Sequence, residues 1–280
     1  MSPADLHFVH VGDSHVASGK TREIDLRRLR DFVERVEGLL ARGVPLDFVV
    51  HTGDLVHDAE RPEATAATSE AALAVLDRLP LRWLLLNGNH DRRAFLVAGT
   101  PDSRAAGRGE VPPTDALGVA RVEIGGVQLL FVDANPESGG QGDLEGALGP
   151  ETIASLGRHV DAHGGRSALF LHYPPLAPEA CWPGAMAGGE ALHAALAPRA
   201  SRLHGVFVGH NHRGVHHLRD GVLYVTAPAL SRQFLLWPEQ REHEIDVEPV
   251  AGLHYVTFGS DGTTRVQHHA FPLIGAGAAP

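Results

Sequence analysis

The chain has 280 residues, of which 43% are hydrophobic and 21% are charged. These values exclude a disordered polypeptide, a coiled coil and a collagen-like repeat. A chain of this length fits one large globular domain, so we expect a single domain over residues 1–280. The net charge of −10 excludes a protein that binds long nucleic acids through bulk positive charge.

The sequence also indicates where the protein works. No apolar run approaches the ~20 residues that a membrane-spanning helix needs. The first five residues include Asp5 and neither Lys nor Arg, which is not typical of a secretory signal peptide. The single cysteine, Cys181, excludes an internal disulfide and fits a reducing compartment. We therefore expect a cytoplasmic protein that has no membrane partner.

The first third of the chain predicts alternating strands and helices. Apolar runs that lead into Gly-Asp or Asn-Gly turns predict strands at 6–11, 47–51 and 82–86. Apolar residues at helical spacing predict helices at 24–40 and 63–79. This order predicts parallel strands joined by right-handed crossovers.

The rest of the chain predicts more antiparallel pairing. Gly125-Gly126 separates two apolar runs, which predicts a hairpin of strands 119–124 and 127–132. The remaining predicted elements are helices at 151–160 and 190–196, strands at 167–172, 206–209, 215–218 and 222–226, and a last hairpin of 253–258 with 263–270. Loops are expected at 92–117 and 133–149, a lid and hairpin region at 229–270, and a frayed tail at 274–280. Together these elements predict a mixed α/β fold of two packed sheets with helices outside.

Polar residues gather at the ends of the predicted strands. Five such places are Asp13-Ser14-His15, Gly53-Asp54, Gly88-Asn89-His90-Asp91, His172 and Gly209-His210-Asn211-His212. The carboxyl ends of neighbouring parallel strands open onto a shared cleft. Asp, Asn and His are residue types that can bind a hard or borderline metal ion. Gly-Asn-His-Asp is expected only about 0.002 times by chance in this composition, so it carries much of the signal.

The order of these motifs resembles the signature of the calcineurin-like metallophosphoesterases. The resemblance runs from Asp13 to His212 and lacks no signature position. Arg92-Arg93 after Gly-Asn-His-Asp, and the run from His172 to Pro175, are similar to bacterial cyclic-nucleotide and glycerophosphodiester phosphodiesterases. The resemblance implies a four-layer αββα sandwich of two mixed sheets flanked by helices.

The resemblance also implies a centre of two transition-metal ions, either Mn, Fe, Zn or Co. In this assignment Asp13, His15 and His212 hold the first ion, and Asn89, His172 and His210 hold the second, with Asp54 bridging them. The residue chemistry agrees, because histidine suits these metals and two ions ~3.5–4 Å apart need a shared ligand. Such a centre would attract a phosphodiester anion even though the chain is acidic overall.

The mechanism expected from this centre is attack on phosphorus by a hydroxide that bridges the two metals. His90 would stabilise charge on the phosphoryl oxygens and protonate the leaving alkoxide, and Asp91 would orient the His90 imidazole. Arg92, Arg213 and Tyr173 are the candidates for contact with substrate, since arginine suits phosphate and the tyrosine ring can stack on a base.

Other histidines are expected to have structural roles or to lie at the surface. His10 and His51 lie within predicted strands, so we expect a structural role or support of the ligands. Surface positions are expected for His57, His216, His217, His268 and His269.

The predicted function is metal-dependent hydrolysis of small phosphodiesters, such as cyclic nucleotides or glycerophosphodiesters. A phosphomonoesterase or a nucleotide-pyrophosphate hydrolase with the same site stays open, because loops set specificity. A nuclease of the same superfamily should show a DNA-binding extension, and none is visible. A non-catalytic scaffold would be expected to lose ligands, and all seven are present. The resemblance allows a homodimer, with residues 229–258 as its interface.

Overall fold

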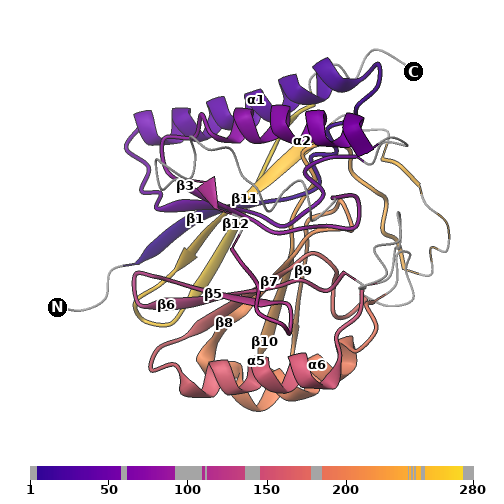
Figure 1. Ribbon diagram of the computed structural model, residues 1–280. Helices are drawn as coiled ribbons and strands as arrows, with labels where there is room; N and C mark the ends of the chain where they lie inside the picture. Colours follow the sequence, from indigo (N-terminus) through magenta and orange to yellow (C-terminus); the bar gives the residue numbers. More distant parts are fainter. Residues whose placement is uncertain are drawn as a thin grey trace.

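The computed structural model describes residues 5–57, 62–91, 109–110, 112–135, 146–177, 185–238, 240, 242, 244–246 and 250–273. Two six-stranded sheets lie face to face, and helices cover the outer face of each (Figure 1). The predicted four-layer α/β architecture is therefore confirmed. Arg92, Cys181 and the expected tail at 274–280 lie outside the described residues.

The first sheet has the strand order β12-β11-β1-β2-β3-β4. Its strands are β1 (Leu6–Val11), β2 (Phe48–His51), β3 (Arg82–Leu85), β4 (Gly109–Glu110), β11 (Val250–Phe258) and β12 (Thr264–Pro272). The four strands β1 to β4 are parallel, whereas β11 runs antiparallel to both β1 and β12. The last predicted hairpin is confirmed, and it extends this sheet beyond β1. The two-residue strand β4 has no counterpart among the predicted elements.

The second sheet has the order β5-β6-β7-β8-β10-β9. Its strands are β5 (Val119–Ile124), β6 (Val127–Val132), β7 (Ser167–Leu171), β8 (Leu203–Val208), β9 (Val215–Arg219) and β10 (Val222–Thr226). β6, β7, β8 and β10 are parallel, with antiparallel strands at both edges. β8 begins three residues before the predicted 206, because His204 and Gly205 interrupt its apolar run yet still belong to the strand.

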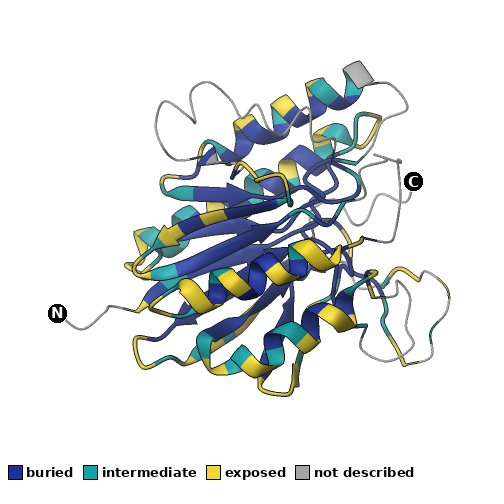
Figure 2. Ribbon diagram, turned by 60° about the horizontal axis from the view of Figure 1, so that its bottom comes forward, coloured by how far each residue is buried: buried dark blue, intermediate teal, exposed yellow. Residues whose placement is uncertain are grey.

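The helices form the two outer layers. α1 (Arg22–Ala41) and α2 (Pro62–Leu76) lie over the first sheet, and α5 (Pro150–Ala162), α6 (Gly189–Leu196) and the 3-10 helix η1 (Ala197–Arg202) lie over the second (Figure 1). The outward faces of the helices are exposed, and most of the strands between them are buried, whereas the edge strands β9 and β12 are largely exposed (Figure 2). Among the described residues, no helix has the length and hydrophobicity needed to span a bilayer.

Aromatic side chains fill the space between the two sheets. Phe8 of β1 stacks on Phe48 at 4.8 Å and meets the edge of Phe258 at 4.9 Å. From the second sheet, Phe170 and Phe207 approach Phe8 edge-on at 5.9 and 5.7 Å. Each such buried side chain contributes about 1.5–3 kcal/mol of transfer free energy. The packing of these rings holds the strand ends of one sheet next to those of the other. The functional site lies at those strand ends.

Candidate metal centre

The polar strand-end motifs of both sheets meet at one edge of the sandwich. Asp13 and His15 follow β1, Asp54 follows β2, and Asn89 follows β3; His172 follows β7, while His210 and His212 follow β8. All seven side chains are buried. A set of buried carboxylates, imidazoles and an amide is unfavourable unless its members bind one another or a cation.

One half of the cluster joins Asp13, His15 and His212. The Nε2 atoms of His15 and His212 lie 2.9 Å apart, and Asp13 Oδ1 lies 3.6 Å from His212 Nε2. One ligand atom from each of the three residues falls within 4.8 Å of the others, a grouping that can hold a metal ion. This half therefore offers two imidazole nitrogens and a carboxylate oxygen.

The other half joins Asn89, His172 and His210. Asn89 Oδ1 lies 3.0 Å from His172 Nε2 and 3.1 Å from His210 Nδ1, and those two nitrogens are 3.2 Å apart. Asp54, His172 and His210 also form a grouping that can hold a metal ion. This half therefore offers two imidazole nitrogens and an amide oxygen, a donor set suited to borderline transition metals.

Asp54 lies between the two halves. Its Oδ2 is 3.4 Å from His15 Nε2 and 3.4 Å from His172 Nε2. Its Oδ1 accepts the backbone N–H of His90 at 2.8 Å, which fixes the carboxylate plane. One carboxylate thus faces ligand atoms of both halves, which is the position a bridging ligand occupies in a two-metal site.

Hydrogen bonds behind the imidazoles set which nitrogen faces the cluster. His172 Nδ1–H donates to the carbonyl of Thr52 and His212 Nδ1–H donates to the carbonyl of Arg232, both at 2.8 Å. Each ring then turns its Nε2 toward the cluster, as metal-binding histidines usually do. His210 differs, because its Nδ1 faces Asn89 while its buried Nε2 has no hydrogen-bond partner among the described residues.

The backbone at these residues is strained. In the described part of the chain, six non-glycine residues have positive φ, and five of them belong to the cluster: Asp13, His15, Asp54, His210 and His212, with φ from 46° to 71°. Each such residue costs on the order of 1–3 kcal/mol, and such strain is concentrated at functional sites. The tight reversals after β1, β2 and β8 turn the side chains inward.

Two glycines make room for the cluster. A Cβ at Gly88 would collide with Asp54 Oδ1, and a Cβ at Gly53 would lie 2.7 Å from His172 Nδ1. Gly53 also has a φ of +98°. The loops after β2 and β3 can pack against each other only because these positions lack side chains.

Gly88→Ala is therefore expected to disrupt the cluster. The added methyl group displaces Asp54 or the backbone that carries His90, so metal affinity should fall by about 10–100-fold, as when a supporting residue is lost. Metal content after dialysis, measured by elemental analysis, checks this. Gly164→Ala is the matched control, since its Cβ would enter open space. Equal metal content in both variants would contradict the argument.

Asp54 and His172 are electrostatically paired. Burial disfavours the charge of both groups, but their mutual attraction outweighs it. The pKa of Asp54 is therefore held well below its usual range, and the pKa of His172 is raised to about 9. Burial instead raises the pKa of Asp13 well above its usual value, with the negative charge of Asp54 adding to the effect. The cluster thus favours an added positive charge.

The remaining cluster histidines are held neutral. Burial lowers the pKa of His210 and His212 to about 3, with the neighbouring charge of His172 acting in the same direction. Burial also lowers the pKa of His15 well below its usual value. A neutral imidazole keeps a lone pair, so these three rings are in the protonation state that a metal ligand requires.

His90 lies beside the cluster with its ring edge-on to His15 at 4.8 Å. Its Nδ1 is buried and has no hydrogen-bond partner among the described residues. Asp91 was expected to orient this ring, and the structure corrects that expectation. The Asp91 carboxylate accepts the backbone N–H groups of Gly88, Val56 and Leu55 at 2.9–3.3 Å. It therefore ties the loop after β3 to the loop after β2.

The environment of Asp91 also changes its protonation. Burial, together with the negative charge of Asp54, raises the pKa of Asp91 to about 7. The backbone N–H groups that it accepts oppose this shift. Asp91 thus joins the two loops through backbone hydrogen bonds, while burial and the charge of Asp54 disfavour its ionised form.

Two of the residues expected to contact substrate, Tyr173 and Arg213, already bind other side chains. Tyr173 is 1% exposed, donates its O–H to Asn135 Oδ1 at 2.9 Å and packs on His172 and His210, so it supports the ligands from behind. Arg213 pairs with Asp246 at 2.5 Å beside a cavity of about 380 Å³ lined also by His216 and His268. The expectation that Tyr173 contacts substrate directly is therefore corrected. The Arg213 guanidinium is paired with the Asp246 carboxylate.

The remaining histidine predictions are mostly confirmed. His10 and His51 are buried, and His51 Nε2 bonds Ser14 Oγ at 2.8 Å, which supports the turn after β1. His216, His268 and His269 are exposed, and His217 is half-buried against Tyr224.

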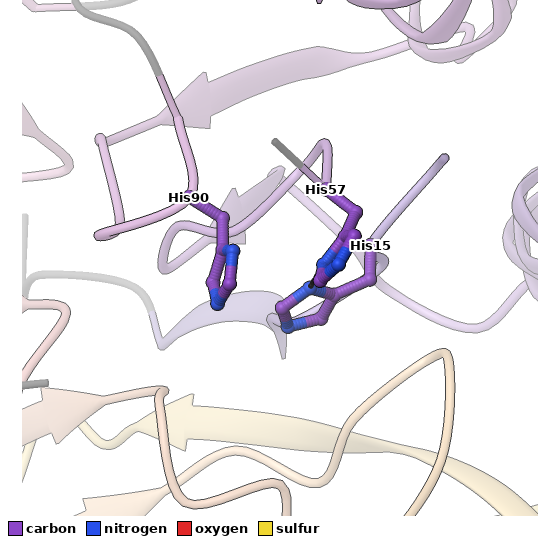
Figure 3. A group of neighbouring side chains, drawn as sticks. All are labelled: His15, His57 and His90. Atoms are coloured by element: carbon purple, nitrogen blue, oxygen red, sulfur yellow. Dashed lines mark hydrogen bonds between the residues drawn. The ribbon is translucent and has the colours of Figure 1, made fainter. Parts of the chain in front are cut away.

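His57 was expected at the surface, and that expectation is wrong. It follows Asp54 by three residues and lies against both His15 and His90 (Figure 3). The spacing after Gly53-Asp54 is the one signal in the sequence that could have drawn attention to it.

Comparison with known proteins agrees with this site. The sequence matches the family described as calcineurin-like phosphoesterase over residues 6–214. The 3′,5′-cyclic adenosine monophosphate phosphodiesterase CpdA of Vibrio vulnificus (strain CMCP6) is 24% identical over 278 residues, covering 96% of this chain and 92% of that protein. A dimetal phosphatase from Danio rerio superposes with a TM-score of 0.64 at 16% identity, over 96% of this chain and 99% of its own. Purple acid phosphatase PPD1 from yellow lupin (Lupinus luteus) superposes with a TM-score of 0.59 at 12% identity, over 96% and 54%.

The matched range contains every residue of the cluster. The chain therefore belongs to the calcineurin-like phosphoesterases, a family of hydrolytic enzymes with a binuclear metal centre. The resemblance that the motifs indicated is confirmed. The two solved structures share its fold.

Proposed function

We propose that this chain hydrolyses small phosphodiesters at a centre of two transition-metal ions. The observation that carries the proposal is the position of Asp54, whose Oδ2 lies 3.4 Å from a histidine nitrogen of each half of the cluster. A carboxylate shared in this way, flanked by an imidazole of each half, is the donor arrangement that a two-metal hydrolytic site needs.

The residues present fit two ions of Mn, Fe, Zn or Co. Asp13, His15 and His212 would hold one, Asn89, His172 and His210 would hold the other, and Asp54 would be shared. Held there, the ions supply Lewis-acid chemistry that activates water and stabilises charge on phosphoryl oxygens. The grouped ligand atoms and the buried carboxylates of the cluster support this assignment.

His90 is our candidate for the general acid. Its ring lies at the edge of the cluster and is only partly buried, so an imidazole nitrogen can give a proton to the leaving oxygen. The backbone N–H of the same residue donates to Asp54 Oδ1, so the loop that carries His90 also holds the shared carboxylate in place. Asp91 positions that loop through its three bonds to backbone N–H groups.

The substrate class rests on the relative rather than on the geometry. The Vibrio protein is named for hydrolysis of 3′,5′-cyclic adenosine monophosphate, which makes cyclic nucleotides the first candidates and glycerophosphodiesters the second. Arg92 stays a candidate for contact with substrate phosphate. The other open function is hydrolysis of phosphomonoesters by the same centre.

Metal removal tests the proposal. Chelation followed by dialysis should abolish hydrolysis of bis(p-nitrophenyl) phosphate, and return of Mn²⁺ or Zn²⁺ should restore it, because activation of water depends on the bound ions. Diester turnover should exceed that of p-nitrophenyl phosphate, with 3′,5′-cyclic AMP tested next. Faster monoester turnover would keep the centre and overturn the substrate class.

Location and assembly stay predictions. The single cysteine supports the cytoplasm as the compartment. Trp237, which is 63% exposed, lies in the segment expected at a homodimer interface. The molar mass in solution, measured by light scattering, would decide the oligomeric state.

A further inference from the structure

A third histidine cluster adjoins the two halves of the candidate centre. His15, His57 and His90 each place one ring nitrogen within 4.8 Å of the others. The rings come from three loops, after β1, β2 and β3, and gather around one space (Figure 3). The motifs assign no role to His57.

The geometry between His15 and His57 suits a metal ion. Their Nδ1 atoms are 3.2 Å apart. With metal–nitrogen bonds of about 2.1 Å, that separation corresponds to an angle of about 100° at the metal, close to the tetrahedral value. The His90 ring stacks on His57 at 4.7 Å and lies 4.8 Å from His15, so its nitrogen can be a third ligand.

The two nitrogens of the His15 ring lie next to different neighbours. Its Nε2 faces His212 and Asp54, within the centre described above. Its Nδ1 points the opposite way, to His57. Without a cation, one proton between the two Nδ1 atoms makes a hydrogen bond. With a cation, that proton leaves to solvent and one nitrogen of each ring binds the metal, with His15 as an imidazolate when its Nε2 also binds an ion of the main centre.

Three imidazoles with no carboxylate form a donor set for a borderline ion such as Zn²⁺. We propose that His15, His57 and His90 form a third metal position, which fills only when metal is in excess. An ion there would lie beside the main centre and would be bound by imidazole nitrogens without a carboxylate, so its affinity is lower than that of the main centre.

Filling this position has a functional consequence, which rests on the proposed function. An ion bound to His90 would hold that ring at the third position, away from a leaving oxygen at the main centre. Excess Zn²⁺ should therefore inhibit phosphodiester hydrolysis through the same residue that hydrolysis needs.

Zinc stoichiometry tests the site without reference to activity. Holoenzyme dialysed against rising free Zn²⁺ should bind one equivalent more than the His57→Asn and His57→Phe variants at saturation. The amide of the first variant can still hydrogen-bond His15, and the phenyl ring of the second can still stack on His90. Agreement between the two variants therefore isolates the lost nitrogen ligand. His269→Asn, at an exposed position, is the control for general loss of a histidine and should bind as the parent protein does.

Equal stoichiometry in the parent protein and both His57 variants would overturn the proposal. Inhibition gives the second readout: the Zn²⁺ concentration that halves diester turnover should rise at least about tenfold in both variants, because a lost ligand weakens metal binding. If the extra equivalent disappears but inhibition is unchanged, the inhibitory role is overturned. If no phosphodiester is hydrolysed by any preparation, the proposed function fails, while the stoichiometry still decides the metal position.

Discussion

Replacing His90 by alanine is expected to lower turnover of 3′,5′-cyclic AMP by about 10²–10⁴-fold, the usual contribution of a general acid. Metal content should stay near two equivalents, because the His90 side chain belongs to neither half of the centre. The backbone N–H that holds Asp54 Oδ1 is retained in the variant. Steady-state kinetics and elemental analysis on the same preparation measure both quantities.

The leaving group separates an acid from a purely electrostatic role. An alkoxide needs a proton to leave, whereas p-nitrophenolate does not, so His90→Ala should slow bis(p-nitrophenyl) phosphate hydrolysis far less than cyclic AMP hydrolysis. His269→Ala, at an exposed position, serves as the matched control. An equal loss with both substrates would remove the general-acid assignment, and so would full activity of the variant.

Asp54→Asn is expected to have the larger effect on the centre itself. The substitution keeps the oxygen that accepts the His90 N–H but removes the charge shared by both halves. Loss of a supporting residue lowers metal affinity by about 10–100-fold, so loss of a shared ligand should exceed about 100-fold. Calorimetric titration of the metal-depleted protein with Mn²⁺ or Zn²⁺ measures this loss of affinity.

Both metal positions should weaken together in that variant. Asp13→Asn, by contrast, should weaken one position more than the other, because Asp13 is grouped with His15 and His212 and reaches the other half only through the backbone N–H of His210. Asp161→Asn, at an exposed ion pair on α5, controls for loss of a carboxylate. Loss of a single equivalent in Asp54→Asn would show that Asp54 is not shared.

The identity of the candidate ligands was accessible from the sequence because it is local information. Gly-Asn-His-Asp and Gly-His-x-His stand at the ends of apolar runs, and a strand end is where a sheet presents polar side chains. The hairpin of 119–124 and 127–132 was likewise predictable, since Gly125-Gly126 determines the turn between two alternating runs. Gly205 shows the opposite case, where a residue that breaks the apolar pattern still pairs in β8.

Which side chains face one another was decided by the tertiary structure. His57 looks like any polar loop residue in the sequence, yet packing of the loops after β1, β2 and β3 brings it against His15 and His90. Asp91 follows His90 but bonds the backbone of another loop, and Tyr173 follows His172 but lies behind it. The sequence by itself determined most of the strands, the order of the motifs and the types of the candidate ligands, because these depend on local pattern. The orientation of each ring and carboxylate depends on contacts between distant segments, which only the packed sheets create.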